Sequence, residues 1–207
     1  MKISIPPVKH EKFHISYAQH SPPILFFDVE SIGVNAFYGD TGIMLMCAYK
    51  WAGEKQTHIL TMTREEFSTL DDTRIVKEIS DLLVRSAIRV AHYGQYFDIK
   101  FINTRRLMLG LDPLPSHILQ VDDTIKTLWK DHKFHKNRLG HIARVLHLTE
   151  EKGESNFPLP WMQIIRFRDD KAWKVYGKMA QYCKQDVRTL EQAYYKLHPE
   201  YRRYNGR

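Results

Sequence analysis

Cysteine is scarce in this sequence, and long apolar runs are missing. Its 207 residues include only Cys47 and Cys183, too few for a disulfide framework or a cysteine-based zinc site. The longest apolar stretches, residues 24–27 and 43–49, fall far short of the roughly 20 residues of a membrane span. Residues 1–7 contain no apolar signal core. We therefore expect a soluble, cytoplasmic protein that has no membrane contact.

Length and charge narrow the class further. A chain of 207 residues suits one sizeable α/β domain. We expect an extended arm over residues 1–23, one domain over residues 24–200 and a short tail over residues 201–207. Lysine and arginine exceed aspartate and glutamate by 31 to 24, for a formal charge of +7. This balance favours polyanionic partners, although an ordinary basic protein would show it too.

Hydrophobic periodicity predicts alternating strands and helices. The expected strands are residues 24–30, 42–51, 56–61, 87–92 and 118–121. The expected helices are residues 64–85 with a break and cap near Asp71, Asp72 and Thr73, then 96–109, 124–130, 138–146 and a last long helix after a loop with Gly153, Pro158 and Pro160. This order predicts an α/β fold, a mixed five-stranded sheet whose first three strands are antiparallel, with helices on both faces.

Asp28 and Glu30 stand out at the end of the first apolar run. Residues two apart in a strand point to the same face of a sheet. Their carboxylates would therefore project together, and two like charges so close require a cation.

Asp186 stands out in the last helix, because it falls on a stripe of otherwise apolar residues. A buried charge costs several kcal/mol unless a partner or a metal neutralises it. Tyr182 lies one helical turn earlier on nearly the same face. Asp98, after the segment His92–Phe97, is a fourth candidate carboxylate. Oxygen ligands without histidine or cysteine favour two Mg²⁺ or Mn²⁺ ions and phosphodiester hydrolysis.

Three segments resemble the motifs of one enzyme family. Asp28-Val-Glu30 is similar to the first motif of the DEDD superfamily of 3′–5′ exonucleases, Phe97-Asp98 to the second, and Tyr182-Cys-Lys-Gln-Asp186 to the third. The spacing Tyr-x-x-x-Asp is that of the tyrosine-bearing DEDDy branch, which includes polymerase proofreading domains. The similarity extends from Ile24 to Leu197, and it includes stand-alone exonucleases of bacteriophages and mobile elements.

The resemblance implies a ribonuclease H-like fold and a specific role for each of these residues. Asp28, Glu30, Asp98 and Asp186 would hold two metal ions, and Tyr182 would position the attacking water. The implied substrate is single-stranded nucleic acid, with DNA favoured over RNA, in a bacterial or phage-infected cell. A separately encoded DNA polymerase is a candidate partner.

Substrate contacts are expected around the first two motifs and in the basic stretch 130–138. The candidates are Ile32, Phe37, Tyr93, Phe97, Lys136 and Arg138. Tyr93 stands where relatives usually have asparagine, so the substrate preference transfers less directly than the chemistry. Two alternatives stay open: an exoribonuclease that uses the same site, and a nucleic-acid-binding subunit without activity. Matched DNA and RNA substrates would distinguish the first, and binding without cleavage would indicate the second.

Overall fold

A mixed five-stranded sheet forms the centre of the protein. The computed structural model describes residues 22–33, 38–149 and 167–204. The strand order is β3-β2-β1-β4-β5, and the strands are β1 (Ile24–Gly33), β2 (Gly42–Trp51), β3 (His58–Thr61), β4 (Ile88–Ala91) and β5 (Asp122–Asp123). Strands β1, β2 and β3 pair antiparallel, whereas β4 and β5 join in parallel. The predicted sheet is confirmed.

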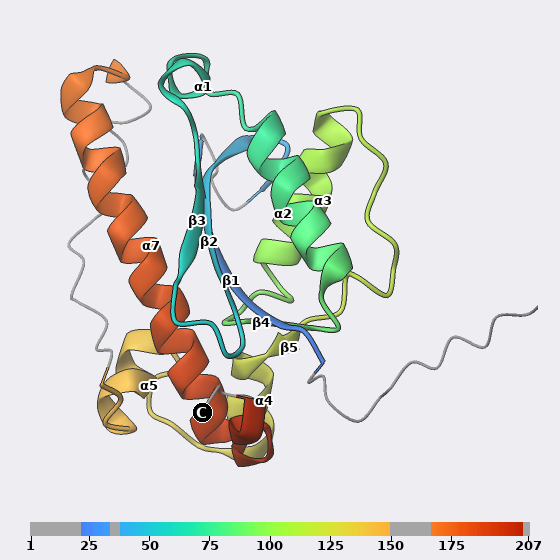
Figure 1. Ribbon diagram of the computed structural model, residues 1–207, viewed down its shortest axis with the longest axis vertical. Helices are drawn as coiled ribbons and strands as arrows, with labels where there is room; N and C mark the ends of the chain where they lie inside the picture. Colours follow the sequence, from blue (N-terminus) through green and yellow to red (C-terminus); the bar gives the residue numbers. More distant parts are fainter. Residues whose placement is uncertain (1–21, 34–37, 150–166, 205–207) are drawn as a thin grey trace, which may run out of the picture.

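Helices cover both faces of this sheet. Helices α2 (Thr73–Arg85) and α3 (Asp98–Met108) lie on one side, and α7 (Asp170–Leu197) runs along the other (Figure 1). The shorter helices are α1 (Arg64–Thr69), α4 (Thr124–Asp131), α5 (Leu139–Val145) and the 3₁₀ turn η1 (Pro199–Tyr204). Helices α4 and α5 lie near the C-terminal end of α7 (Figure 1). Within the described residues, no helix is both long enough and apolar enough to span a membrane.

Tyr176 joins α7 to the sheet. Its buried hydroxyl donates to the carbonyl oxygen of Leu45 at 2.6 Å and accepts from the backbone N–H of Met62 at 2.6 Å. Asp169 precedes the helix, and its side chain accepts from the N–H of Ala172 and caps the first turn. These contacts fix the position of α7 along the strands.

Most predicted elements are present, with shifted ends. The helical segment 64–85 does break into α1 and α2, but the buried carboxylate of Asp72 makes no capping bond. It accepts instead from Met44 N–H and from Arg105. The fifth strand was predicted over residues 118–121 but is the short β5, and the N–H of Ile118 donates to Pro115 in a turn. The predicted loop with Gly153, Pro158 and Pro160 lies outside the described residues, as does the arm up to residue 21.

An ion pair between Glu66 and Arg74 gives a pH prediction. Arg74 donates to both carboxylate oxygens of Glu66, from Nε at 2.8 Å and Nη2 at 2.7 Å, and these bonds lower the pKa of Glu66 from 4.5 to about 2. A lowered folded-state pKa stabilises the protein above pH 4.5, and this stabilisation is lost as the pH falls toward 2. Since Arg74 is partly exposed, we expect Glu66→Gln to cost about 1 kcal/mol at pH 7.

Urea unfolding of wild type and Glu66→Gln between pH 7 and pH 3 measures this difference. The gap in unfolding free energy should narrow below pH 4.5 and approach zero near pH 2. A gap that stays constant over this range would contradict the assignment.

Candidate active site

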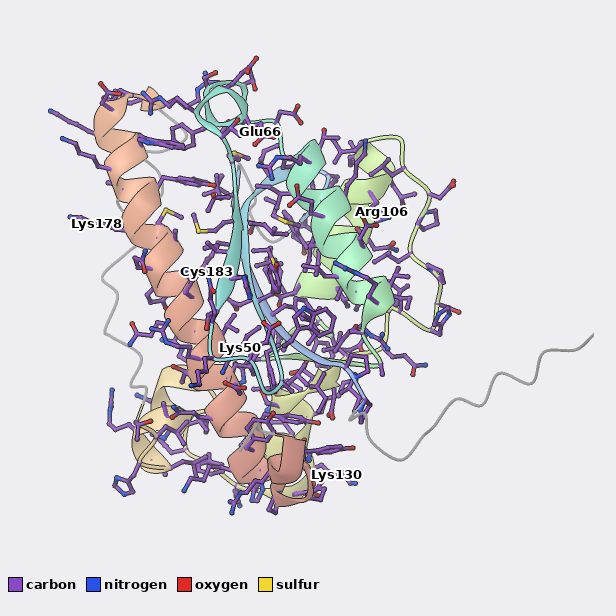
Figure 2. The ribbon with its side chains drawn as sticks, viewed as in Figure 1. Lys50, Glu66, Arg106, Lys130, Lys178 and Cys183 are labelled. Atoms are coloured by element: carbon purple, nitrogen blue, oxygen red, sulfur yellow. The ribbon has the colours of Figure 1, made fainter. Side chains whose placement is uncertain are left out.

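Strand β1 presents Asp28 and Glu30 together on the side that faces α7. Both side chains are partly buried. One carboxylate oxygen from each and the Sγ of Cys183 on α7 all lie within 4.8 Å of one another. The thiol of Cys183 donates to Oδ2 of Asp28 at 3.6 Å, so α7 packs directly against these acidic residues. Figure 2 shows Cys183 between α7 and the sheet.

Asp98 reaches the same strand from the first residue of α3. Its Oδ1 accepts from the backbone N–H of Val29 at 2.9 Å, between the two acidic residues. Strand β4 pairs with β1 only as far as Phe26. The edge of β1 beyond that point is open to other donors and acceptors, and Asp98 uses it.

Burial controls the protonation of Asp98. The side chain is only 3% exposed, and loss of solvent raises its pKa to about 7, with a smaller contribution from the negative charge of Asp123. The hydrogen bond from Val29 opposes this rise. A cation next to Asp98 would favour the charged carboxylate, since positive charge lowers the pKa of an acid.

Helix α7 carries both Tyr182 and Asp186. Asp186 is buried and Tyr182 is partly buried. Asp186 lies three residues after Cys183, so both side chains project from the same face of the helix. Because Cys183 contacts Asp28, the face that bears Asp186 is turned toward β1.

Asp123, at the end of β5, holds the loop that leads into Asp98. Its carboxylate accepts from Tyr93 N–H at 2.8 Å, Gln95 N–H at 2.9 Å and Ile125 N–H at 3.1 Å. Tyr93 has a backbone φ of 68°, a conformation that residues other than glycine rarely adopt. No sequence pattern predicted this structural role for Asp123, because an acidic residue after an apolar stretch is common in turns.

Gly94 is required by close packing in this loop. A Cβ at this position would lie 2.2 Å from the Cβ of Ala91 and 3.5 Å from Oδ2 of Asp98. We expect Gly94→Ala to lower the free energy of unfolding by about 1–3 kcal/mol, as overpacking does elsewhere. Denaturant unfolding measures the loss, and the double variant Ala91→Gly with Gly94→Ala should recover part of it. Equal stability of Gly94→Ala and wild type would contradict this packing.

The residues predicted to contact nucleic acid have different surroundings. Ile32 is 4% exposed and pairs with Ile43 inside the sheet, so its side chain offers little surface to a base. Tyr93, Lys136 and Arg138 are exposed, and Phe97 is partly buried against Phe101. Phe37 lies outside the described residues.

The sheet order and the helices on both faces define an α/β protein with the ribonuclease H-like fold. A family model of the RNase H superfamily matches residues 25–198, and the chain belongs to this superfamily. This membership supports nuclease activity.

Comparison with solved structures supports the same fold. The chain is similar to the family B DNA polymerase from the hyperthermophilic archaeon Pyrobaculum calidifontis, with 17% identity and a TM-score of 0.63. The similarity covers 87% of this chain and 25% of the polymerase chain. This chain therefore corresponds to about one quarter of the length of the polymerase. A comparison with curated proteins found no match.

Proposed function

We propose that the protein is a metal-dependent 3′–5′ exonuclease of single-stranded DNA. The observation that carries this proposal is the convergence of Asp28, Glu30 and Asp98 on one short stretch of β1, opposite the face of α7 that bears Asp186. The similarity of these segments to the DEDDy motifs supports the 3′–5′ direction. We propose that the active domain spans residues 24–200 and acts alone or beside a separately encoded DNA polymerase.

The donor set fits two Mg²⁺ or Mn²⁺ ions. Asp28, Glu30, Asp98 and Asp186 provide the carboxylate oxygens that hard cations prefer. Cys183 lies next to these carboxylates, but Mg²⁺ and Mn²⁺ prefer oxygen ligands to sulfur. Burial raises the pKa of the Cys183 thiol well above its ordinary value. With ions bound, such a site supplies a water of lowered pKa and stabilises the leaving oxygen.

The protein side chains have distinct roles in this mechanism. The carboxylates hold the ions, and Tyr182 orients the attacking water through its hydroxyl. Tyrosine is a poor base because its ordinary pKa is near 10, so positioning is its main contribution. The water oxygen attacks the terminal phosphorus while the bond to the 3′ oxygen breaks. The products are a nucleoside 5′-monophosphate and a strand shortened by one nucleotide with a new 3′ hydroxyl.

A time course on 5′-labelled single-stranded DNA and on RNA of the same sequence tests this proposal. The reactions contain Mg²⁺, Mn²⁺ or a chelator. A ladder that shortens from the 3′ end of DNA only with metal is the expected result. Degradation of RNA alone would identify an exoribonuclease, and intact strands in every reaction would contradict nuclease function.

A further inference from the structure

Three aromatic rings gather on the surface beside the candidate active site. Tyr93 and Tyr96 come from the loop between β4 and α3, and Trp129 comes from α4. Their side chains are 47%, 42% and 52% exposed. The Tyr93 and Tyr96 ring centroids lie 5.2 Å apart, and those of Tyr96 and Trp129 lie 5.8 Å apart. Large rings rarely gather outside a core unless they contact a ligand or partner.

Lysine side chains border these rings. The ammonium groups of Lys126 and Lys100 lie 5.7 Å and 5.9 Å from the centroid of Tyr96. Lys130 is exposed next to Trp129, at the end of the molecule where α4 lies (Figure 2). On α4, Lys126, Trp129 and Lys130 occupy one helical face, whereas Asp131 points away from it. The surface thus combines flat apolar rings with positive charge.

Hydrogen bonds hold the backbone of the loop that bears Tyr93 and Tyr96. Asp123 binds the N–H groups of Tyr93 and Gln95, and Tyr96 precedes Asp98 by two residues. The neighbouring His92 contacts the carbonyl oxygen of Asn137 at 2.8 Å. This contact joins the ring-bearing loop to the basic segment that contains Lys136 and Arg138.

We propose that Tyr93, Tyr96 and Trp129 form a stacking site for unpaired bases of a nucleic-acid strand outside the catalytic centre. Lysines 100, 126 and 130 would neutralise the adjacent phosphates. Exposed rings stack on any base but only on bases that are not paired, so the site selects single strands without sequence preference. That the bound strand is also the substrate rests on the proposed nuclease function.

Binding to labelled oligothymidine of about 16 nucleotides, measured by fluorescence anisotropy in chelator, tests the site independently of cleavage. We expect Trp129→Ala and Tyr96→Ala each to weaken binding about tenfold. Trp129→Phe should bind nearly as wild type, because a ring is retained. A blunt-ended duplex, which has no unpaired bases, should bind no more weakly to the alanine variants than to wild type.

Matched controls lie on the other side of the molecule. Phe167 is 58% exposed just before α7, and Lys178 lies on the outer side of that helix (Figure 2). Phe167→Ala should leave binding unchanged. Lys126→Ala should reduce the salt dependence of binding, whereas Lys178→Ala should not.

The outcomes separate this proposal from the nuclease function. Wild-type affinity in Trp129→Ala and Tyr96→Ala, or an equal loss in Phe167→Ala, would overturn the stacking site even if the protein cleaves DNA. Selective loss of binding in the two variants would support the site even if no cleavage occurs. Circular dichroism melting establishes that each variant is folded.

Discussion

Asp28→Asn and Asp186→Asn are each expected to reduce the rate of DNA cleavage by more than about 100-fold. Loss of a residue that only supports a metal ligand costs about 10- to 100-fold, so loss of a ligand itself should cost more. Asparagine keeps the size of the side chain but removes the charge that binds a cation. Single-turnover cleavage of 5′-labelled single-stranded DNA in Mg²⁺ measures the effect.

Asp81→Asn is the matched control, because Asp81 is exposed on α2 and is not a candidate ligand. This variant should cleave at the wild-type rate. Thermal melting with and without Mn²⁺ adds a readout that does not depend on activity, since an ion that binds only the folded state raises the melting temperature. Asp186→Asn should show a smaller rise than wild type. Full activity of Asp186→Asn would remove Asp186 from the site.

Local patterns were sufficient to predict the central part of the fold. The strand predicted over residues 42–51 has the bounds of β2, because a continuous apolar run between glycine and turn residues reports a buried strand. The break near Asp71 also appears in the structure. Hydrophobic periodicity indicates which residues are buried, so it predicts the strands and helices that pack against the core.

Residues that depend on distant partners were harder to predict. Residues 118–121 resemble a strand because Ile118 and Val121 are apolar, and both are buried. The segment nevertheless leads through a turn into β5. Asp72 looked like a helix cap, but its partners Met44 and Arg105 are far away in sequence. Neither the turn at residues 118–121 nor the partners of Asp72 can be predicted from neighbouring residues.

The candidate site also contains residues with a local sequence signal and residues without one. Asp28, Glu30 and Asp186 could be predicted as candidate metal ligands because each places a charge in or beside an apolar pattern. Cys183 fits the apolar stripe of its helix, so its contact with Asp28 could not be anticipated. No local pattern predicted a role for Asp123, because its bonds to the loop before Asp98 depend on β5 lying next to β4. Carboxylates that bind metal and carboxylates that bind backbone look alike in sequence.

Arg105→Met is expected to lower the free energy of unfolding by about 3–5 kcal/mol. Arg105 is 7% exposed and donates to Asp72 from Nε at 2.9 Å and Nη2 at 2.6 Å. Asp72 is 1% exposed, so removal of Arg105 leaves a buried carboxylate that keeps the hydrogen bond from the Met44 N–H but has lost its cation. For a chain of this size the loss corresponds to a melting temperature lower by roughly 6–20 °C.

The adjacent Arg106 gives a matched control for this prediction. Its Nε donates to the carbonyl oxygen of Asp112 on the surface, and Arg106→Met should cost less than about 1 kcal/mol. The double variant Asp72→Asn with Arg105→Met should be more stable than the sum of the single losses implies, because it removes the uncompensated charge. Additive losses, or equal effects at the two arginines, would mean that the pair does not act as a unit. A coupled loss would mean that this ion pair holds the start of α2 and helix α3 against β2. Because α3 begins at Asp98, the pair would then also support the candidate active site.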